Sequence, residues 1–546
     1  MDLLTVENLT FTYPLCSSPA VQDVSFAVQE GEFTVLCGAT GSGKSTLLRL
    51  LKRELSPKGE RTGHVFYRGT SVDELSAGVS ARSVGFVMQK PEQQIVTDKV
   101  WHELAFGLEN MNIPQPVIAR RVAEMASYFG IEAWYEKSVS ELSGGQIQLL
   151  NLAAVMVMNP DILILDEPTA QLDPIAASDF IATLKKLNSD FSLTVLIVEH
   201  RLEELIPVCD RLMVMENGKL IGDGSPREVI SHLKNKDELL LAMPAAVRLY
   251  HALGSAGECP LTIREGRRFL ENGYENRVRS LPGENSISTK TPALEFSDIC
   301  FRYERNLPDV VRDLNLTIYE NEIFCILGGN GSGKTTTLGC AAGLLKPYSG
   351  TIRVFGKKLK EYKNQSLYRE CLALLPQDVQ TVFLRNTVRE ELSDAGADSL
   401  ALPFDISHLY GKHPYDCSGG EQQLVALAIV LAAKPKLLLM DEPTKGLDAA
   451  RKQTIIDILR KLKASGVTIV VVTHDVEFTA GCADRCAMFF RGNVVSSGVP
   501  DEFFSENTFY TTAASRMSKG HYDRAVTVET IAELCRINNR KGGDEV

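Results

Sequence analysis

The sequence lacks the long apolar runs that a membrane-spanning helix requires. Such a helix needs about 18–20 consecutive apolar residues, and the longest candidate, Leu424–Ala433, is followed directly by Lys434 and Lys436. An excess of positive charge is missing too, because 58 Lys and Arg residues face 69 Asp and Glu residues, which gives a net charge of −11. Sequence-independent binding of nucleic acid depends on basic surface. We therefore expect no nucleic-acid partner for the chain as a whole.

Cysteine clusters and disordered stretches of extreme composition are also absent. The 12 cysteines are scattered singly, which in a reducing compartment is typical of buried, small apolar residues. The apolar fraction of 44% and the charged fraction of 23% are those of a folded globular protein. At about 100–200 residues per domain, 546 residues predict several domains.

Two copies of one motif set occur in the sequence, in the same order. The repeated segments are Gly38–Ser45 and Gly328–Thr335, then Ser143–Gly145 and Ser418–Gly420, then Leu165–Thr169 and Met440–Thr444, and finally His200 and His474. The glycine-rich segments lie 290 positions apart and the Ser-Gly-Gly segments 275 apart, so the second copy is shorter between them. A repeat of this length indicates two whole domains in tandem.

The motif positions and a polar stretch near Asn285–Pro292 predict the domain boundaries. We expect a first module at 1–230, a helical extension at 231–285, a linker at 286–292, a second module at 293–505 and a C-terminal extension at 506–546.

The motifs lie in a strand, loop and helix context. Phe33–Cys37 is a short apolar run before the glycine loop, and Ser45–Leu55 has the apolar spacing of a helix. Continuous apolar runs predict further parallel strands, covered on both faces, at Ile162–Leu165, Leu193–Val198, Leu437–Met440 and Val467–Val472. The polar residues that follow these strands lie at their carboxyl ends, where open α/β sheets bind ligands.

The glycine loops predict binding of ATP and Mg²⁺. Glycines allow backbone N–H groups to surround phosphate oxygens, and the helix N-terminus adds positive potential. We expect Lys44 and Lys334 to reach the β- and γ-phosphates, and Ser45 and Thr335 to bind Mg²⁺.

The acidic pairs that follow the apolar runs Ile162–Leu165 and Leu437–Met440 predict hydrolysis. Asp166 and Asp441 are expected to hold Mg²⁺, and Glu167 and Glu442 to polarise a water molecule aimed at the γ-phosphate. A capping carboxylate would explain one such pair, but two copies in the same context favour catalysis.

The Ser-Gly-Gly segments precede long apolar helices. Ser143 and Ser418 could act as N-caps, and the bare glycines also offer a second anion site on exposed amides. Each module would then have two anion-binding helix ends, more than one triphosphate needs, so the nucleotides are expected to be shared between the modules.

The remaining candidates are aromatic, amide and imidazole side chains. His200 and His474 follow a strand at matched positions and are expected to sense the γ-phosphate. Tyr13 and Tyr303 could be ordinary strand aromatics or could stack on adenine.

At this point the motifs identify a family, because each half resembles an ATP-binding-cassette (ABC) ATPase over nearly its full length. The resemblance implies an α/β fold of two P-loop NTPase modules, each with a mostly parallel core sheet, a β subdomain, a helical subdomain and a small C-terminal helical extension. It also implies a head-to-tail pairing of the two halves, with two composite ATP sites. The implied nucleotide-binding residues are Tyr13, Gly38, Gly41, Gly43, Lys44, Ser45, Thr46, Gln89, Ser143, Gly144, Gly145, Gln146, Tyr303, Gly328, Gly331, Gly333, Lys334, Thr335, Thr336, Gln377, Ser418, Gly419, Gly420 and Glu421. Gln89 and Gln377 match the family's Q-loop and are also expected at Mg²⁺.

Two departures from the family pattern are visible. The second signature has Cys417 and Glu421 where Leu and Gln are usual, and the first D-loop has Gln171 in place of a small residue. A carboxylate near a triphosphate predicts that the site with Lys44 is slower, although we expect both sites to hydrolyse ATP.

A narrower resemblance is to the ATPases of energy-coupling-factor importers, which take up vitamins or transition-metal ions. It rests on Gln89–Val96, Val100–Asn110 and the extension Pro244–Gly273. It implies a transmembrane coupling subunit, a small integral-membrane substrate-binding subunit and a peripheral location at the cytoplasmic face of the membrane. Glu103 and Glu391 are candidate contacts with basic residues of the coupling subunit, or solvated charges on a helix face.

Two other functions remain open. A soluble tandem ABC ATPase acting on ribosomes or nucleic acid usually has a long charged linker, which is not seen here. A fused sugar-importer ATPase would have one degenerate site, whereas both sites here keep their Lys, Asp, Glu and His.

Overall fold

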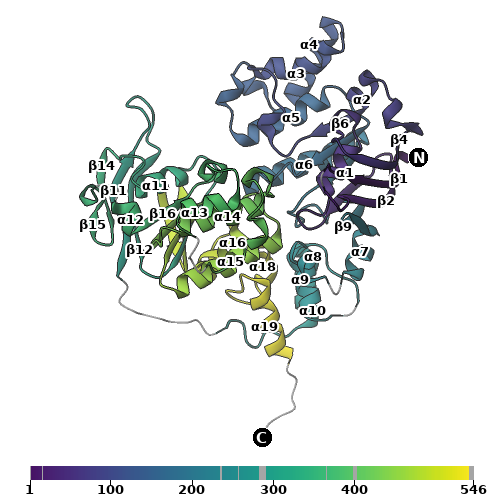
Figure 1. Ribbon diagram of the computed structural model, residues 1–546. Coiled ribbons are helices and arrows are strands. Elements are labelled where there is room, and N and C mark those ends of the chain that lie inside the picture. Colours follow the sequence, from purple (N-terminus) through teal and green to yellow (C-terminus); the bar gives the residue numbers. More distant parts are fainter. Residues whose placement is uncertain are drawn as a thin grey trace. The chain divides into compact units, whose positions relative to one another are not determined.

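The computed structural model consists of two compact units (Figure 1). It describes residues 2–14, 16–233, 236–255, 257–281, 291–363, 366–397 and 402–539. The first unit comprises Met1–Pro244 and Gly257–Leu261, and the second comprises Ala245–Ala256 and Thr262–Val546. Most of the expected linker, 286–292, lies outside the described residues.

The first unit is an α/β module. Its strands are β1 (Asp2–Thr12), β2 (Val21–Gln29), β3 (Phe33–Cys37), β4 (Glu60–Tyr67), β5 (Thr70–Ser71), β6 (Val84–Val87), β7 (Ile162–Asp166), β8 (Thr194–Val198), β9 (Arg211–Glu216) and β10 (Lys219–Gly224). Its α-helices are α1 (Lys44–Leu50), α2 (Ala77–Ser83), α3 (Val100–Asn110), α4 (Gln115–Tyr128), α5 (Gly144–Met156), α6 (Pro174–Phe191), α7 (Pro226–His232) and α8 (Asp237–Leu241).

The second unit repeats this plan and adds a small helical domain. Its strands are β11 (Pro292–Phe301), β12 (Val311–Tyr319), β13 (Ile323–Leu327), β14 (Ser349–Val354), β15 (Lys357–Lys358), β16 (Leu372–Leu375), β17 (Leu437–Asp441), β18 (Thr468–Thr473), β19 (Arg485–Phe490) and β20 (Asn493–Gly498). Its α-helices are α9 (Ala245–Ala252), α10 (Ile263–Gly273), α11 (Lys334–Ala341), α12 (Ser366–Glu370), α13 (Val388–Asp394), α14 (Gly419–Leu431), α15 (Ala449–Ala464), α16 (Val476–Cys482), α17 (Pro500–Glu506), α18 (Ala513–Ser518) and α19 (Val528–Asn539).

Each module has a six-stranded core sheet and a four-stranded antiparallel sheet. The core sheets have the orders β10-β9-β3-β8-β7-β6 and β16-β17-β18-β13-β19-β20, and they are parallel except for the β9–β10 and β19–β20 pairs. The antiparallel sheets have the orders β2-β1-β4-β5 and β12-β11-β14-β15. The predicted α/β class with mostly parallel core sheets is confirmed.

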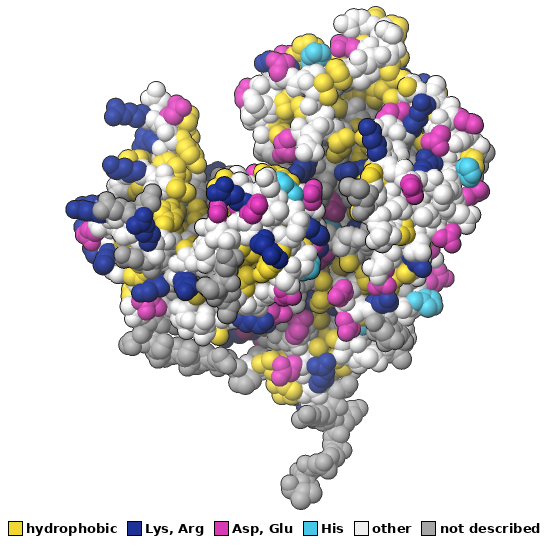
Figure 2. Space-filling view, viewed as in Figure 1, with side chains coloured by type: hydrophobic (Ala, Val, Ile, Leu, Met, Phe, Trp, Pro, Cys, Tyr) yellow, Lys and Arg dark blue, Asp and Glu magenta, His cyan; other side chains and the backbone are white. Residues whose placement is uncertain are grey.

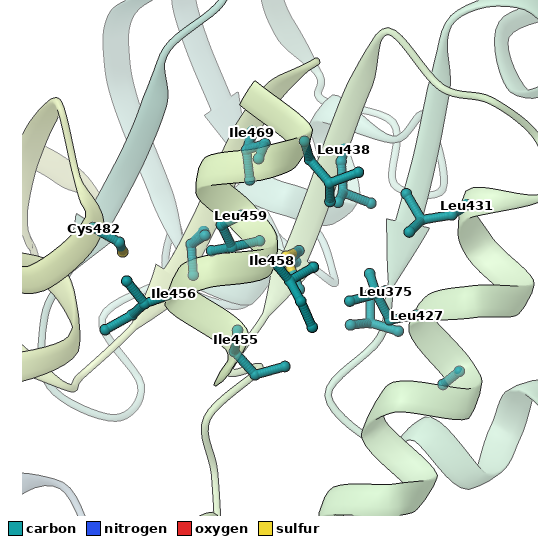
Figure 3. Packing of buried hydrophobic residues seen from close by; sticks show 14 of the residues in the cluster. Leu375, Leu427, Leu431, Leu438, Ile455, Ile456, Ile458, Leu459, Ile469 and Cys482 are labelled. Carbon is teal, nitrogen blue, oxygen red and sulfur yellow. The ribbon is translucent and has the colours of Figure 1, made fainter. Parts of the chain in front are cut away.

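Apolar strands covered by helices hold each core sheet together. Every residue of β7 and β17 is buried, as expected for parallel strands with helices on both faces. In the second module, Ile455 and Leu459 of α15 and Leu427 of α14 belong to one buried cluster with strand residues (Figure 3). Each fully buried Leu or Ile contributes about 1.5–3 kcal/mol to folding.

One predicted helix is shorter than expected. The segment Ser45–Leu55 was expected to be continuous, but α1 ends at Leu50, and a short 3₁₀ helix, Arg53–Leu55, follows it. Lys52 between them has an extended backbone, and its ammonium donates to the carbonyls of Ser80 and Val84, at 3.2 and 2.5 Å. These contacts hold the Lys52 side chain at the break between the two helical segments.

The expected extension 231–285 is divided between the units, and its helices α9 and α10 form one helical domain with the C-terminal extension inside the second unit. Helices α9 and α10 pack on α18 and α19, and their shared core includes Leu249, Leu270, Met517 and Leu534. The Asn538 side chain donates to the Val278 carbonyl and accepts from its amide, both at 2.9 Å. Segments more than 200 positions apart in the sequence are thereby joined.

The visible surface carries charges of both signs. Figure 2 shows Asp and Glu side chains interspersed with Lys and Arg, with apolar side chains between them. Among the described residues, no helix combines the length and the apolar character that crossing a membrane demands.

Candidate nucleotide-binding and hydrolysis sites

The glycine loops join β3 to α1 and β13 to α11, at the carboxyl ends of the central strands. The last glycines, Gly43 and Gly333, have φ angles of 98° and 104°, which L-residues with a Cβ atom rarely adopt. A Cβ atom at Gly43 would lie 2.1 Å from the Ala20 carbonyl oxygen, and one at Gly333 would lie 2.6 Å from that of Val310. Only glycine therefore fits at these two positions. A loop without side chains here leaves its backbone amides accessible to a phosphate.

The ammonium group of each loop lysine is hydrogen-bonded to carbonyls at the start of its own glycine loop. Lys44 Nζ donates to the carbonyls of Gly38 and Ala39, both at 2.8 Å. Lys334 Nζ donates to Gly328 and Gly329, at 2.7 and 3.0 Å. Both lysines are nearly completely buried, so each ammonium is fixed at the centre of the loop that would hold phosphate oxygens.

The expected Mg²⁺ ligands meet in each module. Ser45 Oγ donates to Asp166 at 2.8 Å, and Thr335 Oγ1 donates to Asp441 at 3.1 Å. Burial raises the pKa of Asp166 above its usual range and that of Asp441 to about 6, although the hydroxyl hydrogen bonds oppose the shift. A buried carboxyl group beside a hydroxyl group suits a divalent cation, which would stabilise the ionised form.

The rest of the cation's ligands would have to come from elsewhere. Among the residues that the structure describes, no cluster of three or more His, Cys, Asp or Glu side chains is placed to hold a metal ion. Mg²⁺ usually keeps several waters and binds through one or two protein ligands together with substrate phosphates. The hydroxyl–carboxyl pairs therefore fit Mg²⁺ that arrives with a nucleotide.

The glutamates after these aspartates have an unusual backbone conformation in both modules. Glu167 and Glu442 have φ angles of 45° and 49°, in the left-handed region that is uncommon for residues other than glycine. Their amides are fixed by hydrogen bonds to the carbonyls of Val198 and Val472, at 2.9 and 2.8 Å. Local strain of this kind is frequent at functional sites, and here it occurs at the same position of both modules.

Each glutamate contacts the histidine that follows the next strand. His200 Nε2 lies 2.9 Å from Glu167 Oε1, and His474 Nδ1 lies 3.0 Å from Glu442 Oε1. Burial would raise the pKa of Glu167, but the hydrogen bond and charge of His200, together with the Lys44 charge, hold it below its usual range. An ionised carboxylate is the form that a general base or a water-orienting group requires.

The two glutamines differ between the modules. Gln89 Nε2 donates to Glu167 Oε2 at 2.7 Å, whereas Gln377 is exposed just after β16. The first module thus brings its glutamine to the acidic pair, and Gln377 lies on the surface.

The tyrosines lie beside the start of the loop helices. The hydroxyl of Tyr13 is 3.0 Å from Thr46 Oγ1, and that of Tyr303 is 3.0 Å from Thr336 Oγ1. The Tyr303 side chain is exposed. This position beside the phosphate loop suits a ring that stacks on the base of a nucleotide.

The signature segments begin α5 and α14 and form capping boxes. Gln146 Oε1 accepts from the Ser143 amide at 2.9 Å, and Glu421 Oε2 accepts from the Ser418 amide at 2.7 Å. The N-cap interpretation of both serines is therefore correct, and it leaves the amides of the following glycines available as an anion site.

The proposed partner contacts Glu103 and Glu391 need correction, because both carboxylates are buried. Glu103 is 6% exposed, and one of its oxygens accepts from the amides of Val96 and Thr97, at 3.1 and 2.8 Å. Glu391 is 4% exposed and accepts from the amides of Leu384 and Arg385. They are neither solvated charges nor free to pair with a partner's basic side chain. Instead they fix a surface loop in each module.

Sequence reasoning missed two further residues. Glu199 is buried and accepts from the Thr169 amide at 2.7 Å, next to the acidic pair. Arg451 donates to the Ser418 hydroxyl at 3.0 Å. An internal alignment could have found Arg451, because the position 33 residues after the signature serine is Ala176 in the first module.

The fold and these paired sites define two ATP-binding modules of the phosphate-loop class. A family model described as ABC transporter matches residues 21–170 and 311–445. A Bacillus thuringiensis subsp. konkukian protein, provisionally named an ABC transporter ATP-binding protein, is 40% identical over 545 residues, covering 97% of this chain and 98% of the relative. A Bacillus subtilis protein provisionally named an HMP/thiamine import ATP-binding protein, YkoD, is 32% identical over 525 residues, with 93% of each chain covered.

Among solved structures, cbiO1 from Clostridium perfringens, described as part of the ABC transporter complex cbiONQ, is 31% identical. The aligned region covers 44% of this chain and 95% of the cbiO1 chain, with a TM-score of 0.39. The family match and the full-length relatives show that the chain belongs to the ABC transporter family, as a tandem ATP-binding protein with ATPase activity.

Proposed function

We propose that this chain is the ATP-hydrolysing subunit of an importer of the energy-coupling-factor type, which takes up a vitamin or a transition-metal ion. It would work at the cytoplasmic face of the membrane, with a transmembrane coupling subunit and a small integral-membrane substrate-binding subunit. The B. subtilis relative is similar over nearly the full chain, and its name refers to HMP/thiamine import, which supports this class of substrate.

The single observation that carries the proposal is a pair of matched surface loops after the Q-loop glutamines. Val96 is 63% exposed and Leu384 is 83% exposed, and each lies seven residues before the buried glutamate that fixes its loop. A large apolar side chain on a rigid loop is a suitable contact for a partner. Two such loops, one per module, suit a coupling subunit with two docking elements.

ATP would be hydrolysed at two composite sites. In this proposal, the loop of Lys44 is completed by the signature of Ser418, and the loop of Lys334 by the signature of Ser143. Ser45 and Asp166 would hold Mg²⁺ in the first module, and Thr335 and Asp441 would hold it in the second. The cation would neutralise charge on the phosphate oxygens.

The chain's own residues then perform the remaining tasks. Glu167 and Glu442 orient and polarise the attacking water, and His200 and His474 hold these carboxylates in place. ATP would favour paired modules and ADP would favour separated ones. Only this difference in affinity between the two states can drive a partner.

Affinity purification from detergent-solubilised membranes of the source cells tests the proposal. We expect a multi-span membrane subunit and a small integral-membrane protein to co-purify with the tagged chain. The Val96→Asp/Leu384→Asp variant should lose both, whereas Val495→Asp, at a side chain that is 60% exposed elsewhere, should retain them. Recovery of ribosomes or nucleic acid without a membrane subunit would overturn the importer assignment and leave the ATPase activity standing.

A further inference from the structure

The two signature loops differ at a pair of positions that lie together in the second module. In the first module the capping residue is the neutral Gln146. In the second it is Glu421, and Glu421 Oε2 accepts from both the amide and the hydroxyl of Ser418, each at 2.7 Å. The signature serine of the second module is thus in direct contact with a carboxylate.

An arginine accompanies this carboxylate. Arg451 Nη1 donates to the Ser418 hydroxyl oxygen at 3.0 Å, and the Arg451 amide is fixed by Asp448 Oδ1 at 2.8 Å, at the start of α15. A Cβ atom at Gly420 would lie 2.3 Å from Arg451 Nη1, so the guanidinium lies directly on the bare backbone of the signature.

The matching position in the first module holds no charge. Ala176 lies 33 residues after Ser143, as Arg451 lies 33 residues after Ser418. Its methyl group would be 3.7 Å from a Cβ atom built at Gly145. The two uncharged residues Gln146 and Ala176 are therefore replaced in the second module by the acidic Glu421 and the basic Arg451.

The charge of Glu421 is offset within the loop. Lys412 Nζ lies 3.7 Å from Glu421 Oε1. Burial would raise the pKa of Glu421, but the Ser418 hydrogen bonds and the charges of Lys412 and Arg451 lower it. Lys137 stands at the position of Lys412 in the first module, so this lysine is common to both. Two basic side chains are new with Glu421: Arg451, and His408, whose Nε2 lies 4.0 Å from Glu421 Oε1 and whose counterpart is Ala133. Of these two, Arg451 also contacts the signature serine.

We propose that Arg451 is a positioning residue for ATP hydrolysis, which offsets the negative charge of Glu421 and fixes the Ser418 hydroxyl group by donating to its oxygen. The proposal rests on the assignment of the Ser418 signature to a bound nucleotide, made above. Without Arg451, the negative charge of Glu421 beside the signature serine is less well offset and repels the triphosphate. Glu421 and Arg451 therefore act as a unit.

A double-mutant cycle on the purified full-length chain tests this unit. We expect Arg451→Ala to lower kcat for ATP hydrolysis by about fivefold or more, because the carboxylate left less well offset beside the signature serine disfavours the triphosphate. Adding Glu421→Gln to Arg451→Ala, which restores the arrangement of the first module, should recover most of the lost rate. A merely structural loss would not be recovered, because the second substitution adds no packing.

The first module offers the reciprocal control. Gln146→Glu should lower kcat, and adding Ala176→Arg should recover it. The proposal is overturned if Arg451→Ala matches the wild type, or if the Glu421→Gln/Arg451→Ala variant is no faster than Arg451→Ala alone.

The site assignment is tested separately by repeating Arg451→Ala in two backgrounds. A loss of residual ATPase activity with Glu442→Gln but not with Glu167→Gln pairs Arg451 with the site of Lys44. The reverse pattern would leave the role of Arg451 standing and refute the composite arrangement in the proposed function.

Discussion

The buried carboxylate of Glu103 should control the stability of the loop that carries Val96. One oxygen of Glu103 accepts three hydrogen bonds, from the Val96 amide at 3.1 Å, the Thr97 amide at 2.8 Å and the Thr97 hydroxyl at 2.9 Å. Glu103→Ala removes this acceptor and leaves the two amides without a protein partner, whereas the Thr97 hydroxyl can still donate to the Lys99 carbonyl at 3.1 Å. Because each such loss costs about 1–3 kcal/mol and the loop is partly hydrated, we expect the loop to lose about 2–4 kcal/mol.

Amide hydrogen exchange measures this loss at the two affected residues. A local destabilisation of about 2 kcal/mol makes exchange at residues 96 and 97 about thirtyfold faster. Glu103→Gln should have a smaller effect, because its amide oxygen can still accept. Glu109→Ala, at an exposed position of the same helix, is the matched control. Unchanged exchange at 96 and 97 in Glu103→Ala would refute the role assigned to this carboxylate.

Three further predictions concern the loop, the acidic site and the helical domain. Gly43→Ala should weaken ATP binding far more than Gly41→Ala, measured by titration with a fluorescent ATP analogue, because Gly41 also has a positive φ but open space at its Cβ position. Asp441→Asn should raise the melting temperature in metal-free buffer above pH 6 and have no effect below about pH 4, because the raised pKa of about 6 makes the ionised, buried carboxyl costly only at the higher pH. Leu270→Ala, at a fully buried side chain, should cost about 2–5 kcal/mol and speed hydrogen exchange in α18 and α19, whereas Val278→Ala, at an exposed side chain, should not.

Much of each module's core could be predicted because its determinants are local in the sequence. The apolar run Ile162–Leu165 became β7, and Leu437–Met440 became β17, each ending one residue later at the aspartate. Their uninterrupted apolar character is typical of strands covered on both faces. The glycine loops and the acidic pairs then follow from their places at the strand ends.

Contacts between distant segments could not be predicted from local pattern. Nothing near Leu270 indicates that it packs with Met517, nearly 250 positions later, because helix amphipathicity shows which face is buried but not its partner. The strained backbone at Glu167 and Glu442 is likewise held by hydrogen bonds that their amides donate to a neighbouring strand.

The burial of Glu103 could have been predicted from the helical period alone. Val100, Leu104 and Leu108 define the apolar face of α3, and position 103 lies on that face, three residues after Val100. A charged side chain on an apolar face is expected to have a hydrogen-bond partner inside the protein. Here the partner is a loop, and its identity required the structure.

We propose that the glutamates after Asp166 and Asp441 drive ATP hydrolysis in both modules. The most direct test is the steady-state ATPase rate of the Glu167→Gln/Glu442→Gln variant, with ATP binding measured on the same sample. We predict that ATP binding is retained and that turnover falls by about a hundredfold or more, within the range for loss of a general base. An unchanged ATPase rate in this variant would contradict the assignment of both catalytic sites.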